Sequence, residues 1–284
     1  MRKGPIILAV MLLIFTLTSL GNSAFAEEQE FPRGETVDVK VMSYNIHHGV
    51  GEDGVLDLER IAQMIEGANA EIIGLQEVDN HWSSRSDLQD QAKRLADRLG
   101  MFYTYAANLD LEPIKPGEPR RQYGTAILSK YPILKSENHP LTKIGNTEQR
   151  GLLEAVINVK GNHLHVYNTH LALTSAERHI QIEEIINIAA KSEGPKVILG
   201  DLNATPESNE MQLLYSNYQD TFAGENKANT YPAANPAKRI DYIFCSTNLE
   251  IKEAKVINTL ASDHLPILTE LVLERNEPFN NGNK

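Results

Sequence analysis

The chain has 284 residues and a formal net charge of −11. Its length suits one large α/β domain or two small ones, and its ordinary apolar content is enough for a substantial core. An acidic surface repels a phosphate backbone at long range, which disfavours a protein that grips long nucleic acid but leaves a local basic cleft open. Cys245 is the only cysteine, so an intrachain disulfide is excluded and a small buried residue is expected there.

The N-terminus has the layout of a secretory signal peptide over residues 1–26. A positive start at Arg2 and Lys3 precedes an apolar run from residue 6 to residue 20, and Ala24-Phe25-Ala26 supplies a small-x-small cleavage site. An uncleaved membrane anchor is the alternative, but the run is shorter than the roughly 20 residues of a spanning helix. We therefore expect cleavage after Ala26, a secreted or extracellular protein, and no stable membrane span in the mature chain.

Residues 27–36 are polar and contain Pro32 and Gly34, which indicates a short linker. Apolar alternation from Val37 then predicts a strand. Apolar residues at helical spacing over 58–65 follow Asp57, a helix N-cap, and a short buried strand is expected over 72–75. Another helix is predicted over 88–99, ended by Gly100.

The rest of the chain is rich in strand patterns. Thr174 and Glu177 form a capping box before a helix whose apolar face includes Ile182 and Ile185. Strands are predicted over 102–106, 123–128, 152–159, 164–169, 197–199, 240–244 and 267–273. A polar tail covers residues 275–284.

No internal repeat and no break divides residues 37–274, which we interpret as one catalytic domain. Strands and helices mix without regular βαβ alternation. This order favours a layered α/β sandwich over a barrel or a doubly wound sheet.

Short polar clusters stand at the ends of the predicted strands. They are Ser43-Tyr44-Asn45, Leu75-Gln76-Glu77-Val78-Asp79, Asn168-Thr169-His170, Gly200-Asp201-Leu202-Asn203, Arg239-Ile240-Asp241-Tyr242 and Ser262-Asp263-His264-Leu265-Pro266. Side chains at i and i+2 of a strand share a face, so Asp201 and Asn203 point the same way if their strand continues through both. Oxygen donors without thiolates suit Mg²⁺, Mn²⁺ or Ca²⁺ better than structural zinc.

In this order, from residue 44 to residue 266, the clusters resemble the endonuclease/exonuclease/phosphatase superfamily. That group includes deoxyribonuclease I-like and exonuclease III-like nucleases, neutral sphingomyelinases and inositol polyphosphate 5-phosphatases. The resemblance implies a four-layer αββα sandwich, deoxyribonuclease I-like, with its active site at one end of the paired sheets. It also implies a divalent metal cofactor, Mg²⁺ or else Mn²⁺ or Ca²⁺.

The resemblance assigns roles position by position. Glu77, Asn45 and Asp263 match the residues of the metal site. His264 matches the general base that activates water, and Asp241 the carboxylate that orients it.

Three further positions match residues that handle the phosphate. Asp201 and Asn203 match those that place the nucleophile and hold the scissile group, and His170 matches a contact that stabilises the charged transition state. His47 departs from the repair-nuclease pattern, which often has Asp there. This leaves open a two-metal variant with His47 as a ligand.

Three arginines are candidates for substrate binding. Arg150 precedes a strand, Arg85 follows the Glu77 cluster, and Arg121 precedes the strand at Tyr123. Solvated loop charge is the alternative for Arg85 and Arg121, and pairing with an acidic neighbour is the alternative for Arg150.

The sequence therefore predicts an exported, metal-dependent phosphoester hydrolase, a phosphodiesterase that acts as a monomer on a phosphoester of unknown identity. A phosphomonoesterase of the same fold is one alternative, and a non-catalytic module that binds a phosphate ligand is another. No His-Glu-x-x-His, Gly-x-Ser-x-Gly or Walker-type loop is present, which argues against a metalloprotease, a serine hydrolase and a P-loop enzyme.

The cleavage prediction is tested on the full-length chain in a bacterial host. We expect the exported protein to begin at Glu27, because the small-x-small site ends at Ala26. Intact-mass measurement of the exported fraction would establish this start. A mature protein that retains residues 1–26 in the membrane fraction would favour the anchor instead.

Overall fold

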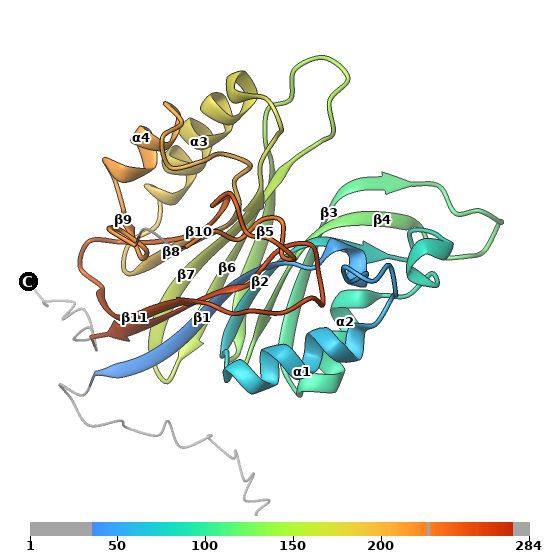
Figure 1. Cartoon of the computed structure of the whole chain (residues 1–284), viewed down its shortest axis with the longest axis horizontal. Coiled ribbons are helices and arrows are strands. Elements are labelled where there is room, and N and C mark those ends of the chain that lie inside the picture. Colours follow the sequence, from blue (N-terminus) through green and yellow to red (C-terminus); the bar gives the residue numbers. More distant parts are fainter. Residues whose placement is uncertain (1–35, 226–227, 275–284) are drawn as a thin grey trace, which may run out of the picture. The chain divides into compact units, whose positions relative to one another are not determined.

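The computed structural model describes residues 36–225 and 228–274, which form two six-stranded sheets packed face to face (Figure 1). The predicted signal peptide, most of the predicted linker and the polar tail lie outside the described residues. The first sheet has the order β11-β12-β1-β2-β4-β3 and the second the order β5-β6-β7-β8-β10-β9. Among the described residues, no helix has the length and apolar character needed to cross a bilayer.

The first sheet consists of β1 (Val37–Asn45), β2 (Ile72–Asn80), β3 (Phe102–Leu111), β4 (Arg121–Ser129), β11 (Glu250–Val256) and β12 (Ile267–Leu273). The second consists of β5 (Ile133–Pro140), β6 (Gly151–Val159), β7 (Asn162–His170), β8 (Lys196–Asp201), β9 (Gln219–Asp220) and β10 (Asp241–Cys245). The helices are α1 (Leu58–Ala68), α2 (Gln91–Leu99), α3 (Ser175–Ala189) and α4 (Met211–Tyr215), with short 3₁₀ turns at His47–Gly49 and Ser84–Ser86.

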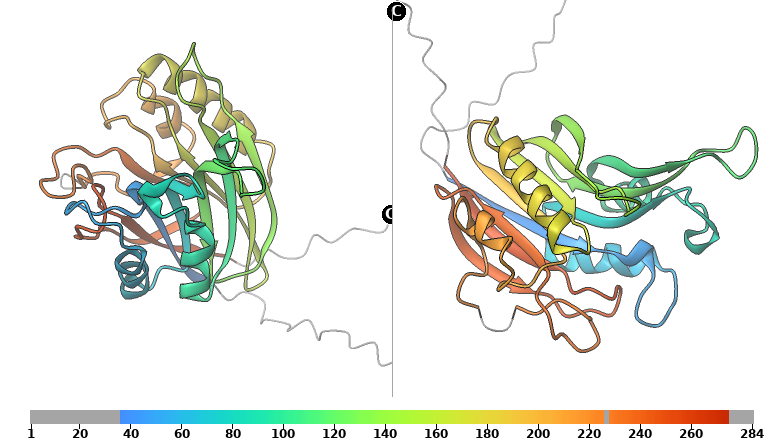
Figure 2. Two further views of the ribbon diagram at one scale, coloured as in Figure 1. Left: turned by 90° about the vertical axis from the view of Figure 1, so that its right-hand side faces the viewer. Right: turned by 90° about the horizontal axis from the view of Figure 1, so that it is seen from above.

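Helices cover the outer face of each sheet, as Figure 2 shows for α3. Ile61 and Ile65 of α1 and Leu95 of α2 pack on the first sheet, while Ile182 and Ile185 of α3 pack on the second. The result is the four-layer αββα sandwich, so the fold prediction is confirmed.

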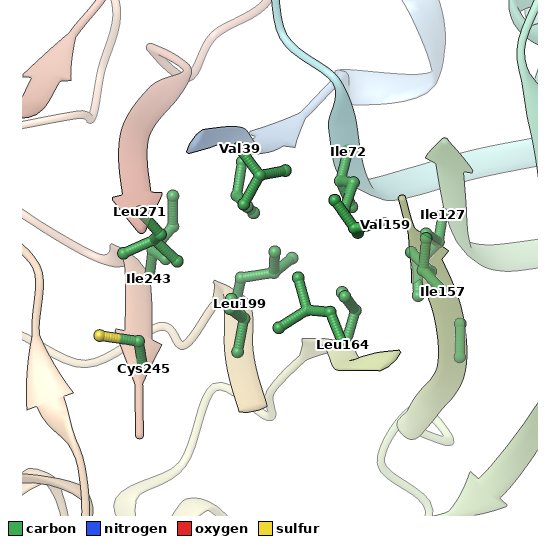
Figure 3. Packing of buried hydrophobic residues seen from close by; sticks show 14 of the residues in the cluster. Val39, Ile72, Ile127, Ile157, Val159, Leu164, Leu199, Ile243, Cys245 and Leu271 are labelled. Carbon is green, nitrogen blue, oxygen red and sulfur yellow. The ribbon is translucent and has the colours of Figure 1, made fainter. Parts of the chain in front are cut away.

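Alternate strand residues fill the space between the sheets (Figure 3). Val39 and Ile72 from the first sheet meet Leu199 and Ile243 from the second in one fully buried cluster. Cys245 belongs to the same cluster at the end of β10, where it is buried and unpaired, as its sequence context predicted. This shared core fixes the two sheets against each other.

Capping residues set the helix limits close to the predicted ones. Asp57 accepts hydrogen bonds from the backbone NH groups of Glu59 and Arg60, and Thr174 accepts one from Glu177. The second helix begins at Gln91 rather than residue 88, because Asp90 accepts from the NH of Lys93 and is its N-cap. Gly100 ends it in the left-handed conformation, as expected.

Three edge strands, β5, β11 and the two-residue β9, were not predicted from the sequence. In β5 most residues are at least partly exposed, and β11 is similarly open. Without a buried face, neither segment shows the alternation of apolar and polar residues that identifies a strand. Pairing with β6 and β12 stabilises them instead.

The sheets approach each other very closely at Gly74. A Cβ atom there would lie 2.0 Å from Leu199 Cδ1 and 3.0 Å from Asn168 Cγ. Both neighbours are fully buried and belong to the opposite sheet. Gly74 therefore lets β2 pack directly on β7 and β8.

We expect Gly74→Ala to lower the free energy of unfolding by about 1–3 kcal/mol through overpacking. Gly67→Ala in α1 is the matched control, because a Cβ there meets nothing within 4 Å. That control should stabilise the protein by roughly 0.5–1 kcal/mol. Urea denaturation of both variants checks the pair, and equal effects would contradict the close contact.

Candidate active site

The polar clusters meet at one edge of the sandwich because of strand direction. β1 runs parallel to β2, and β7 runs parallel to β8, so the carboxyl ends of each pair lie together. β10 is antiparallel to β8, which sets Asp241 at its start opposite Asp201 at the end of β8. The loop that carries Asp263 and His264 leads into β12, which is antiparallel to β1.

A buried chain of three side chains lies at this edge. His264 Nδ1 is 2.9 Å from Asp241 Oδ2, and His264 Nε2 is 3.6 Å from Asp201 Oδ2. All three residues are at most 4% exposed. One aspartate thus orients the ring from its Nδ1 side, while the other faces the Nε2 atom.

Opposing effects set the protonation of these three side chains. Burial lowers the pKa of His264, but the Asp241 and Asp201 carboxylates outweigh it and raise that pKa to about 10. Burial raises the pKa of Asp201 to about 7, although His264 pulls it down. The free site therefore keeps a proton on the imidazole at neutral pH.

Asn45 connects this group of three side chains to Glu77. Its Nδ2 donates to Glu77 Oε1 and to Asp201 Oδ2, both at 3.0 Å, and its Oδ1 accepts from the backbone NH of His47. Glu77 has φ of +58° and sits where the pairing of β2 with β4 shifts between Leu75 and Val78. Such a bulge redirects a side chain out of the regular strand pattern.

Asp263 lies beside this group with a partly exposed carboxylate. Its Oδ1 accepts a hydrogen bond from Ser262 Oγ at 3.3 Å and is 3.8 Å from His47 Nδ1. His47 Nδ1 is itself 3.2 Å from the carbonyl oxygen of Val50. The local turn from His47 to Val50 therefore holds His47 next to Asp263. His47 is the residue that the sequence analysis left open as a ligand of a second metal ion.

The strand does not continue from Asp201 to Asn203, so the expectation of a shared strand face was wrong. β8 ends at Asp201, and Asn203 has φ of +50°. A tight turn brings them together instead, since the backbone NH of Asn203 donates to Asp201 Oδ1 at 2.9 Å. Asn203 Nδ2 donates to the carbonyl of Leu171.

His170 and Arg150 complete one wall of the site. His170 Nε2 lies 3.5 Å from Asp201 Oδ2. Burial, with further contributions from Arg150 and His264, holds the pKa of His170 well below its usual value, so its ring is neutral. The side chain of Arg150 is 8% exposed and pairs with Glu148 at 2.8 Å, while its buried Nε has no hydrogen-bond partner among the described residues.

The other two predicted arginines have protein partners. Arg85 makes two hydrogen bonds, of 2.8 and 2.7 Å, to the buried carboxylate of Asp79, and its guanidinium lies over the rings of Trp82 and Tyr123. Arg121 Nε donates to the carbonyl of Glu112 in the β3–β4 hairpin. Of the three, Arg150 contributes charge directly beside His170.

Sequence reasoning missed two residues of the loop that precedes β10. Thr230 Oγ1 donates to Asp241 Oδ2 at 2.5 Å, and the ring of Tyr231 lies 4.8 Å from that of His264. Both residues support the orientation of the Asp241–His264 pair. The loop carries no motif, so only the fold could place them there.

Two sets of residues in the site offer donor atoms to a metal ion. Asp201, Asp241 and His264 present donor atoms within 4.8 Å of one another, but a hydrogen bond between His264 and Asp241 already engages two of the three. Glu77 and Asp263 are more open carboxylates at the mouth of the same site. The chemistry of both sets is dominated by oxygen donors.

Comparison with known proteins identifies the family of this chain. The model of the endonuclease/exonuclease/phosphatase family matches residues 42–264, which span every cluster described above. The chain belongs to this family. The activities in that family name all hydrolyse phosphate esters.

Several proteins similar to this chain come from bacteria. Protein YbhP of Escherichia coli K12 is 27% identical over 256 residues, covering 82% of this chain and 96% of that protein. An endonuclease/exonuclease/phosphatase structure from Beutenbergia cavernae has a TM-score of 0.70 at 24% identity, covering 83% of this chain and 72% of that one. A mannosyl-6-phosphatase structure from Bacteroides thetaiotaomicron has a TM-score of 0.67 at 20% identity, covering 83% and 100%.

The charge arrangement around His264 predicts the effect of Asp241→Asn. Removing one anionic neighbour should lower the pKa of His264, moving its titration to lower pH by at least about one unit. NMR titration of the ring nitrogens, with His264→Ala to assign the signal, measures the shift. An unchanged titration in a variant that still melts cooperatively would contradict the pairing.

Proposed function

We propose that this protein is a metal-dependent phosphodiesterase that uses water as its nucleophile. The observation that carries the proposal is the arrangement of His264 between two aspartates: it is hydrogen-bonded to Asp241 and lies 3.6 Å from Asp201. Asn45 joins Asp201 to Glu77 through two hydrogen bonds. A buried proton acceptor held beside a charged imidazole, next to an open carboxylate, is an arrangement that can activate water for attack on phosphorus. Asp201 rather than His264 is then the acceptor, which differs from the role that the resemblance implied for His264.

The proton of the attacking water passes to the His264–Asp201 pair. Nε2 and Oδ2 stand 3.6 Å apart, close enough for one water molecule to contact both. Because the two aspartates favour a protonated ring, Asp201 provides the oxygen that takes the new proton, and His264 balances its charge. Asp241 and Thr230 hold the ring in place.

Glu77 and Asp263 would hold the metal ion, with Asn45 next to them. The fit is good: their donors are carboxylate oxygens, and Glu77 receives just one hydrogen bond from the described residues, from Asn45 Nδ2. When bound, Mg²⁺ or a similar ion supplies Lewis-acid chemistry to the phosphoryl and leaving oxygens.

His170, Asn203 and Arg150 would hold the phosphate. His170 is neutral and buried, so it donates a hydrogen bond without competing for the proton of the water. Arg150 brings a positive charge that Glu148 only partly offsets, since that glutamate is 39% exposed. Charge that develops on the phosphoryl oxygens is stabilised best by such fixed donors in a site with little water.

The natural substrate we propose is a small diester rather than a long nucleic acid, handled outside the cell by a monomer. The chain is acidic overall, and Arg85 is already paired with Asp79. Arg120 in the β3–β4 hairpin is paired with Asp110 and Glu112. These pairs leave little free positive charge for an extended polyanion.

A phosphomonoesterase is the second candidate, favoured by the likeness of fold to the mannosyl-6-phosphatase. A monoester carries more negative charge than a diester, and Arg150 is one cation able to meet it. The unpaired Nε of Arg150 is a donor that such a ligand would use.

The deciding experiment compares bis(p-nitrophenyl) phosphate with p-nitrophenyl phosphate in Mg²⁺, Mn²⁺, Ca²⁺ or EDTA. We expect cleavage of the diester that needs metal and falls by a factor of about 10²–10⁴ in His264→Ala. Glu77→Gln should be similarly inactive. Glu71→Gln, at the residue that immediately precedes β2, is the matched control and should keep full activity.

Each result has a clear meaning. Cleavage of the monoester alone would establish the phosphatase alternative. Full activity in His264→Ala would overturn the mechanism. Binding of phosphate ligands without turnover in any metal would support the non-catalytic module instead.

A further inference from the structure

A second group of metal-ligating side chains lies on the outer face of the second sheet, away from the site described above. Glu137 and His139 of β5 face Glu154 of β6, and donor atoms of these three residues lie within 4.8 Å of one another. His139 Nε2 is 2.9 Å from Glu154 Oε2. Because residues i and i+2 share a face, Glu137 and His139 present their side chains together.

His165 of β7 adds a fourth donor. Its Nδ1 lies 3.9 Å from Glu154 Oε1, is buried, and has no hydrogen-bond partner among the described residues. The atom is therefore available to a cation that Glu154 also contacts. A buried polar atom without a partner is costly unless something else satisfies it.

A bound cation would also reduce the repulsion between the negative charges of this cluster. Glu137 and Glu154 are directly opposite each other in the β5–β6 register, and like charges in such a pair destabilise a sheet. Lys135 is 3.3 Å from Glu137, but its side chain is 67% exposed and its charge is weakened by solvent. Tyr167 and Ser192 add hydroxyl groups 3.3 Å from Glu154 Oε1.

We propose that Glu137, His139, Glu154 and His165 form a binding site for a transition-metal ion such as Zn²⁺. Two imidazoles and two carboxylates are a ligand set typical of Zn²⁺, and they differ from the oxygen-rich donors of the active site. Tetrahedral ligands about 2.0–2.1 Å from zinc are separated by about 3.4 Å. The separations of 2.9 and 3.9 Å between each imidazole and Glu154 are close to that value. His165 lies outside the group of three residues whose donors are within 4.8 Å of one another, so its ring has to move toward them when the ion binds.

The ion would join three strands at the edge of the second sheet. β5 is the edge strand, and its only strand partner in the described part of the chain is β6. A metal that bridges β5, β6 and β7 would therefore stabilise the folded state, by an amount that grows with the ratio of its free concentration to its Kd. The proposal does not depend on the catalytic activity.

The experiment measures Zn²⁺ binding by equilibrium dialysis in excess Mg²⁺, in a Glu77→Gln background that weakens the active site. We expect one equivalent of Zn²⁺ per chain, and at least a tenfold loss of affinity in His139→Ala and in His165→Ala. The visible spectrum of bound Co²⁺ should change in the same variants. Zn²⁺ should raise the melting temperature of the parent but not that of the double variant, which combines His139→Ala with His165→Ala.

His179→Ala is the matched control. His179 lies 3.5 Å from Glu183 on the exposed surface of α3, so this substitution removes an exposed His–Glu pair. It should leave Zn²⁺ binding unchanged. Equal Zn²⁺ binding by the parent and the double variant would overturn the site, as would an equal loss in His179→Ala. Melting of the metal-free variants shows whether they fold, and His165→Gln provides a milder change if His165→Ala does not.

Discussion

The architecture of the active site depends on the bulge in β2 and on the asparagine that compensates for it. The register shift between Leu75 and Val78 interrupts pairing with β4 and leaves backbone carbonyls in the space between the sheets. Asn168, from the opposite sheet, donates to the carbonyls of Leu75 and Ala126 at 2.9 and 2.8 Å and accepts from Gln76. Buried carbonyls need such partners, so this one side chain lets the bulge exist and Glu77 leave the strand pattern.

Strand direction then converts this local feature into a site. Two parallel pairs deliver Asn45, Glu77, His170 and Asp201 to a common edge, and antiparallel neighbours return the chain at Asp241 and ahead of β12. Concentrating carboxylates there is unfavourable unless each has a partner. Asn45 and His264 provide such partners within the protein, and their contacts stabilise the buried carboxylates of Asp201 and Asp241.

The sequence predicted the parts of the fold whose signals are local. Asp57, Thr174 and Gly100 mark helix ends through their own side-chain or backbone chemistry, and the interior strands show apolar runs. The exposed edge strands β5 and β11 lack that signal. In the site, strand-end motifs identified the polar residues, but the pairing of Arg85 with Asp79 and the support of Asp241 by Thr230 arise from tertiary packing. The turn at Asn203 shows the same limit, because a single left-handed residue changed the side-chain direction inferred from strand geometry.

The two His–carboxylate clusters contain similar residues and differ in surroundings, which explains why their chemistry should differ. In the candidate active site His264 has a carboxylate on each side, so the ring keeps a proton, which suits the acid–base role that we propose for it. On the outer face, burial keeps His165 neutral, and its free nitrogen points toward Glu154. A protonated imidazole repels a cation, whereas a neutral one binds it. The same residue type therefore handles protons at one place in the fold and favours a metal ion at the other.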